Sequence, residues 1–253
     1  MWLKVDYHPA SLFSFRNIRA TGSGATTLLC PTPFAVKSAL VDVAIKTKGI
    51  KYGKSVFENI RASEIRFKLP DICVVNKTII RIFNLDNRFL SEGTPGHTND
   101  LLRALRDENG NAITDNPVKP AFREFVYFKG NLSIAINVSD FDDNLVEELI
   151  ELFRMVNYFG KKGSFMQFLN AETCDALEDG FLQRMDEKRI KKVGNRNFLL
   201  TVEDTNENIS FNQINVFDST ETLKRTEQIG HYYLLVPAEE ILSGKRYKYI
   251  RVR

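Results

Sequence analysis

Residues 14–49 read SFRNIRATGSGATTLLCPTPFAVKSALVDVAIKTKG. Two arginines come first, a loop rich in Thr, Gly and Ser follows, and Pro31-Thr32-Pro33 then opens a helix. Proline suits the first helical position, Thr32 is a suitable cap, and Gly49 lies just beyond the last turn, so we expect a helix over 33–46. Cations followed by backbone amides and a helix N-terminus are well suited to holding a phosphate chain.

The segments on either side of this helix predict an α+β fold. A second amphipathic helix is expected over 140–159, with Ser139 and Asp142 as a capping box and Gly160 at its end. The predicted strands of this part cover 2–7, 61–69, 72–83, 122–138 (bent or turned at Gly130) and 165–169. The order strand, helix, strand, strand, insertion, strand, helix, strand favours a ferredoxin-like βαββαβ domain with an elaborated β region.

Two further parts of the chain are less regular. Residues 84–120 are punctuated by Gly, Pro and Asn, and an irregular stretch of that length is usually functional or disordered. Strands are expected in the C-terminal part near 197–203, 211–217, 231–236 and 247–253. We therefore predict a first domain over 1–175, with 84–120 as an insertion, and a β-rich extension over 176–253 that packs on the same domain.

Composition narrows the classes of protein. The chain has 253 residues, of which 43% are apolar and 26% charged, as in ordinary globular proteins. No apolar run approaches the length of a membrane span and no signal peptide is visible, so we expect a cytoplasmic protein without a membrane partner. The three cysteines (Cys30, Cys73, Cys174) and three histidines (His8, His97, His231) are scattered. This spacing predicts buried or partly buried free thiols, no metal site and no cofactor.

The net charge of +3 conceals an asymmetry. Residues 1–90 carry 14 Lys and Arg against 6 Asp and Glu, whereas the remaining residues carry 21 against 26. A basic N-terminal part on a nearly neutral protein suggests a face that binds a polyanion. An uneven but solvated surface is the alternative.

Four segments in order resemble the fifth family of CRISPR-associated proteins (Cas-five), a member of the RAMP superfamily. They are SFR (14–16), PTPFAVKSALVDVAI (31–45), REFVYFKGNLSIAI (123–136) and YFGKKGSF (158–165). Phe125 and Phe159 depart from the Tyr and Leu that are common in the family at these positions. The likeness covers roughly residues 1–170.

The resemblance implies a non-catalytic subunit of a type I interference (Cascade) complex. Such a subunit binds the 5′ handle of the CRISPR RNA and caps a filament of Cas-seven-type backbone subunits. It also contacts the large Cas-eight-type subunit, through which the complex meets target DNA. The resemblance further implies that 1–175 is a RAMP domain, related to the RRM, with a thumb-like insertion at 84–120.

The candidate RNA-binding residues are cations and loop residues within or beside these segments. Arginines pair with phosphates or stack on bases, and glycine-rich loops allow close approach to an RNA backbone. Ordinary surface charge and a plain helix-ending turn are the alternatives for these positions. The predicted set is Arg16, Arg19, Thr21, Ser23, Thr26, Thr27, Lys37, Arg123, Lys161 and Lys162.

Two other functions stay open at this point. In one subtype the family member is a metal-independent endoribonuclease, and Tyr7 and His8 near Arg16, with Lys37 or Lys161, are the residues that would supply an acid and a base. The second alternative is a stand-alone RNA-binding module.

Overall fold

The computed structural model describes residues 1–18, 20, 24–83, 109, 118–185 and 197–253. One of its two larger sheets has four strands in the order β5-β8-β1-β9, and every neighbouring pair is antiparallel. The alternation of β1 turns Leu3, Val5 and Tyr7 to the buried face. The strands are β1 (Trp2–Pro9), β5 (Ile65–Lys68), β8 (Leu132–Asn137) and β9 (Met166–Cys174).

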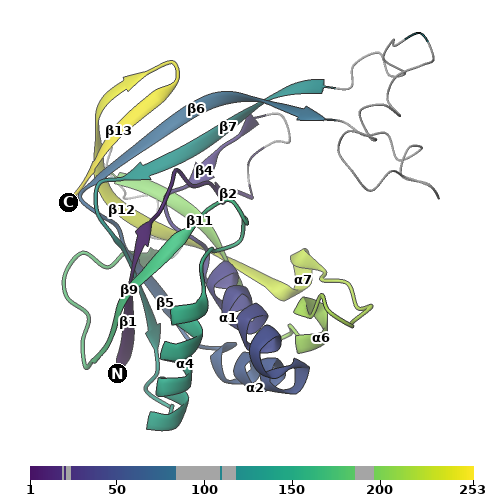
Figure 1. Ribbon diagram of the computed structural model, residues 1–253. Coiled ribbons are helices and arrows are strands. Elements are labelled where there is room, and N and C mark those ends of the chain that lie inside the picture. Colours follow the sequence, from purple (N-terminus) through teal and green to yellow (C-terminus); the bar gives the residue numbers. More distant parts are fainter. Residues whose placement is uncertain (19, 21–23, 84–108, 110–117, 186–196) are drawn as a thin grey trace.

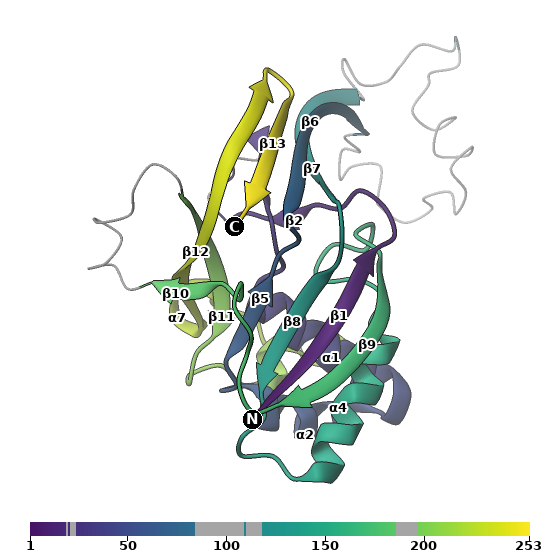
Figure 2. The same cartoon turned by 90° about the vertical axis from the view of Figure 1, so that its left-hand side faces the viewer.

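Three helices cover the buried face of this sheet, as Figure 2 shows: α1 (Pro33–Lys48), α2 (Ile50–Ile60) and α4 (Asp143–Met155). The predicted cap of the first helix is confirmed, because Thr32 Oγ1 accepts the amide of Ala35 at 3.1 Å. Gly49, at a φ of 87°, ends α1. The second predicted helix is shorter than expected. It is capped by Asp142, while Ser139 Oγ instead accepts a hydrogen bond from the Met1 amino group.

A second, curved sheet stands beside the first and reaches away from the helices (Figure 1). Its path is β10-β12-β13-β6-β7-β3, and β11 pairs with β12. Strands from both ends of the chain therefore share one sheet, since β13 pairs with β6. The strands are β3 (Gly24–Ala25), β6 (Ile72–Phe83), β7 (Val118–Phe128), β10 (Gln183–Met185), β11 (Asn197–Thr205), β12 (Ile229–Gly244) and β13 (Tyr247–Val252).

Two short strands and two short helices complete the described fold. The strands β2 (Phe15–Arg16) and β4 (Thr27–Leu28) pair with each other, and the helices are α6 (Phe211–Ile214) and α7 (Arg225–Gln228). The strand predicted over 211–217 is wrong: Ser210 and Gln213 form a capping box that starts α6 there. Helix α2 went unpredicted. Most of the predicted insertion 84–120 lies outside the described residues, and its last three residues begin β7.

The core is continuous from the first sheet to the second. Cys30 and Cys73 are buried and Cys174 is half-buried, all as free thiols, which confirms the expectation for these residues. No helix within the described ranges is both long and apolar enough to cross a membrane.

Candidate functional site

A reciprocal pair of hydrogen bonds joins the first predicted motif to the last. The hydroxyl of Ser164, in the glycine-rich turn after α4, accepts the Ser14 amide at 3.1 Å and donates to the Ser14 carbonyl at 3.1 Å. Ser164 is almost completely buried, so this contact lies inside the protein. The segments SFR and YFGKKGSF, about 150 residues apart, are therefore fixed side by side.

The loop before α1 is held between the same segments. Thr27 Oγ1 accepts the amide of Phe15 at 2.9 Å, and Arg16 pairs with Thr27 across the β2–β4 ladder. Glu124, on β7, accepts the Thr27 amide with its Oε2 at 3.0 Å. These bonds bring the REF strand to the same place, so all four motif segments meet.

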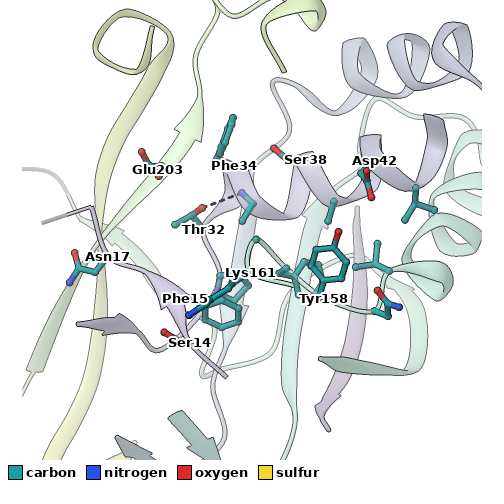
Figure 3. A pocket seen from close by; sticks show the side chains of 18 of the residues that line it. Ser14, Phe15, Asn17, Thr32, Phe34, Ser38, Asp42, Tyr158, Lys161 and Glu203 are labelled. Atoms are coloured by element: carbon teal, nitrogen blue, oxygen red, sulfur yellow. Dashed lines mark hydrogen bonds between the residues drawn. The ribbon is translucent and has the colours of Figure 1, made fainter. Parts of the chain in front are cut away.

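A pocket of about 910 Å³ opens where they meet (Figure 3). Ser38 and Asp42 line it from α1, and Tyr158 and Lys161 line it from the turn after α4. Its apolar lining is contributed by Pro31, Phe34, Ala35, Ala39, Val43, Met155, Val156 and Phe159. An apolar floor with a few polar groups is the usual lining of a site for an organic ligand.

The charges around the pocket are partly neutralised by each other. Lys46 pairs with Asp42 at 2.5 Å, and the Arg225 guanidinium pairs with the buried carboxylate of Glu203 at 3.3 Å. Arg225 also lies over the ring of Phe34, 5.8 Å from its centroid. Because each of these cations is neutralised by a carboxylate, the pairs form part of the pocket wall and add little attraction for an anion.

Lys161 differs from these paired cations. Its Nζ lies 5.9 Å from the centroid of the Phe125 ring, and within the described part of the chain it forms no ion pair. Arg123 lines the same pocket, and its guanidinium donates to the Phe122 carbonyl at 3.0 Å. Arg123 from the predicted strand and Lys161 from the predicted turn thus join Lys46 and Arg225 at the pocket.

The N-terminus of α1 offers less to an anion than the sequence predicts. Thr32 Oγ1 already takes the amide of Ala35, and Pro33 has no amide proton. The attraction for phosphate at this place therefore rests on side-chain cations rather than on the helix end.

The predicted RNA-binding residues other than Lys37 fall into three groups. Thr26, Arg123 and Lys161 line the pocket, and Thr27 supports it from behind. Lys162 is exposed but is not among the residues that line the pocket. Arg19, Thr21 and Ser23 lie outside the described residues, and for Arg16 only the backbone is described.

Lys37 corrects the prediction, because it lies in the core with 1% of its surface exposed. Its ammonium donates to Asp204 Oδ1 at 2.7 Å, to Thr205 Oγ1 at 3.0 Å and to the Arg61 carbonyl at 2.8 Å. Burial lowers the pKa of Lys37 below its ordinary value of 10.5, although Asp204 acts in the opposite direction. Burial likewise raises the pKa of Asp204 above its ordinary 3.8. This lysine joins α1 to β11 and does not face a ligand.

Of the residues named for an endoribonuclease, Tyr7 and Lys37 are buried in the core. Tyr7 is buried and donates its hydroxyl to the Phe153 carbonyl at 2.5 Å, and burial raises its pKa far above the ordinary value. His8 instead lies within hydrogen-bonding distance of Asn131, with its Nδ1 3.0 Å from Oδ1. Lys37 is in the core, as described above. Within the described ranges, no group of three His, Cys, Asp or Glu side chains is placed to hold a metal ion.

Sequence reasoning missed the contribution of the C-terminal part to this pocket. Glu203 and Arg225 both line it, and Glu203 also lies 3.9 Å from His231 Nε2. The signal was the segment FLLTVEDT (198–205), which places two carboxylates, Glu203 and Asp204, at the end of a largely apolar strand. A buried carboxylate of this kind requires a partner.

Comparison with known proteins adds a full-length relative. No family model matches the chain. The chain is 23% identical over 255 residues to a CRISPR-associated protein Cas5 of Archaeoglobus fulgidus, covering 100% of this chain and 99% of the relative. The chain is similar to Cas5 from end to end. The resemblance to the Cas-five family, predicted from four segments, is thereby confirmed and extended to the insertion and the C-terminal part.

Two solved structures complete the comparison. One is a CRISPR protein from Archaeoglobus fulgidus, at a TM-score of 0.40 and 12% identity. The match covers 100% of this chain and 92% of the chain in that structure. The other is a chain of a CRISPR RNA-guided surveillance complex, at a TM-score of 0.40 and 11% identity, with coverages of 100% and 89%.

Proposed function

We propose that this chain is a non-catalytic subunit of a type I CRISPR interference complex and that it binds the 5′ handle of the CRISPR RNA. The observation that carries the proposal is the meeting of all four Cas-five motif segments at one pocket, fixed by the reciprocal bonds of Ser14 and Ser164. A binding site built from several segments requires that they be held together at one place in this way.

The pocket has the chemistry of single-stranded RNA recognition. Lys161 and Arg123 supply positive charge for phosphates, and the apolar floor accepts the face of an unstacked base. Arg16, Arg19, Thr21 and Ser23 lie between Ser14 and Pro31 in the sequence, and we retain them in the proposed RNA-binding set.

The fold supports the same assignment. The strand order β5-β8-β1-β9, with helices following β1 and β8, supports a ferredoxin-like unit, and we infer that this unit is the RAMP domain. We further propose that the hairpin of β6 and β7 carries the thumb-like insertion. The proposed partners are the Cas-seven-type backbone subunit, the large Cas-eight-type subunit and, through the complex, target DNA.

Binding of a synthetic RNA that carries the repeat-derived handle of the host array tests the proposal. We expect affinity to fall steeply between 50 and 300 mM salt, because phosphate contacts release counterions. An RNA of equal length without the handle is the control. Equal binding of the two RNAs, or a flat response to salt, would contradict handle recognition.

A further inference from the structure

The curved second sheet presents an aromatic face to solvent on the side away from the core. In antiparallel sheets, directly paired residues share a face. The paired residues Leu242, Tyr249, Val74 and Tyr127 therefore form one row across β12, β13, β6 and β7. Gly244, Tyr247, Asn76 and Phe125 form the next row.

The opposite face of the same strands is buried. Val75, Val126, Phe128 and Ile250 alternate with the residues of the aromatic face and lie in the core. On the aromatic face, Tyr127 is 51% exposed, Leu242 57% and Tyr247 42%. We call the set Tyr127, Tyr247, Tyr249, Leu242 and Phe125 the aromatic platform.

Close packing holds one ring of the platform in place. A Cβ atom at Gly244 would lie 2.8 Å from Cε1 of Tyr247, so the ring of Tyr247 covers the glycine across the β12–β13 turn. The Arg246 carbonyl of this turn accepts the amide of Lys77 at 2.7 Å, which fixes the turn to β6. The platform is thus a shaped surface on paired strands rather than a group of loop side chains.

The region around the platform is strongly basic. Residues 72–83, 118–130 and 238–253 carry ten Lys and Arg against three Asp and Glu, a net charge of +7, whereas the whole chain carries +3. Of the ten, Lys248, Arg251 and Arg253 pair with Glu240 and Glu239. Lys245, Arg246 and Lys129 are exposed in the turns at the ends of these strands. Lysine is depleted at the centres of protein–protein interfaces, so this charge favours a polyanion over a protein partner.

Spacing suits single-stranded nucleic acid. Phe125 and Tyr127 are two residues apart on β7, about 7 Å, and Tyr249 lies two strands from Tyr127, about 10 Å. Tyr127, Tyr247 and Tyr249 can each take a base, whereas Lys161 already lies over Phe125, and each base can stack without sequence-specific contacts. Lys161, which lines the pocket described above, lies over Phe125 and so connects the pocket to the platform.

We propose that the aromatic platform is a second binding surface, which stacks the bases of a single-stranded nucleic acid that continues from the pocket. The proposal rests on the proposed RNA-binding function of the pocket and extends it by a surface formed largely by the C-terminal part. The strand is RNA, because the platform is linked through Lys161 and Phe125 to the pocket that we propose for the RNA handle.

The test compares variants of the full-length protein by fluorescence anisotropy, with labelled U12 RNA and dT12 DNA as probes at 50 mM salt. We expect Tyr127→Ala/Tyr249→Ala to weaken binding by about tenfold or more, and Tyr127→Phe/Tyr249→Phe to retain it. Phe217→Ala is the matched control, because Phe217 is 46% exposed on the loop between α6 and α7, outside the platform. A loss confined to dT12 would contradict the assignment of the platform to RNA.

Contrary outcomes separate this inference from the function of the pocket. If Lys161→Ala weakens U12 binding while the double alanine variant does not, the proposal of base stacking on the platform is wrong, and the proposal of RNA binding at the pocket is retained. If Tyr127→Leu/Tyr249→Leu binds as tightly as the wild type, apolar area suffices and stacking is wrong. If the wild type binds neither probe nor handle RNA, both proposals are wrong.

Discussion

The hydroxyl of Ser164 accepts the amide of Ser14 and donates to its carbonyl, so one buried side chain satisfies both backbone groups of a residue 150 positions earlier. A hydroxyl can do both because it carries one donor and two acceptor lone pairs. The contact fixes the glycine-rich turn against β2, and the pocket depends on that position.

Ser164→Ala tests this contact. The substitution leaves the Ser14 amide and carbonyl without their partner, and we expect the free energy of unfolding to fall by about 1–3 kcal/mol in urea denaturation. Ser55→Ala on the exposed face of α2 is the control and should change stability by less than about 0.5 kcal/mol. Equal stability of the two variants would show that the Ser14–Ser164 contact contributes nothing.

Lys37 and Asp204 give a prediction about both mutation and pH. Removing one partner, as in Asp204→Ala, leaves an uncompensated buried charge and should destabilise the protein by about 3–5 kcal/mol. Replacing both, as in Lys37→Met/Asp204→Leu, should be nearly neutral or stabilising. Denaturant unfolding of the two variants checks this order.

The pKa directions of the same pair set the sign of the pH effect. The pKa of Asp204 is raised, so the folded state binds a proton before the unfolded state, and stability increases as pH falls toward 3.8. The pKa of Lys37 is lowered, so stability increases as pH rises toward 10.5. The stability of the wild type relative to the double variant should therefore be lowest at intermediate pH, between these two ranges. A flat difference across pH would contradict the assignment.

Lys161→Ala should weaken handle-RNA binding several-fold. Loss of one phosphate contact on a single strand should also lower the slope of log affinity against log salt by about 0.7. Lys161→Arg should retain both values, and Lys162→Ala is the neighbouring control, because Lys162 does not line the pocket. If the two alanine variants behave alike, the turn attracts RNA only by its general charge.

Gly53 sits where α2 crosses the end of α1. An added Cβ would lie 2.3 Å from Cγ1 of Ile45, so Gly53→Ala should destabilise the protein by about 1–3 kcal/mol through overpacking. In an Ile45→Ala background the same change should cost nothing, because the obstructing atom is gone. Gly163→Ala, where no atom lies within 4 Å, is the control. Thermal unfolding of the four variants measures the coupling.

Local signals in the sequence were enough for the helices with clear ends. Thr32 and Gly49 bracket α1, and Asp142 starts α4. Helix α2 was missed for two reasons. It begins directly after Gly49 without a side-chain cap that would mark its start, and it contains Gly53, a residue that disfavours a helix. The capping box of Ser210 and Gln213 is a helix signal that the sequence contains, but residues 211–217 were instead predicted to form a strand.

For the candidate site, too, residues in local motifs differ from residues whose environment depends on partners distant in sequence. Lys161 belongs to a local motif and lines the pocket, whereas its role in RNA binding stays a prediction. Lys37 was misjudged because its partner Asp204 lies 167 residues away, and no local pattern on α1 distinguishes a buried lysine from an exposed one. Glu203 reaches the pocket only through the pairing of β11 with β12, which is a property of the folded chain.

The position of β13 between β6 and β12 has a consequence for folding order. Cys73 on β6 pairs with Ile250 on β13, so the curved sheet is complete only after the last strand has been added. Pairings between residues this distant in sequence form slowly. Until then β6 and β12 each present an open edge, a template for pairing with other chains. A chain that stops after Gly244 should therefore aggregate where the full chain stays monodisperse, as light scattering would reveal, so the last strand acts as the molecule's own edge protection.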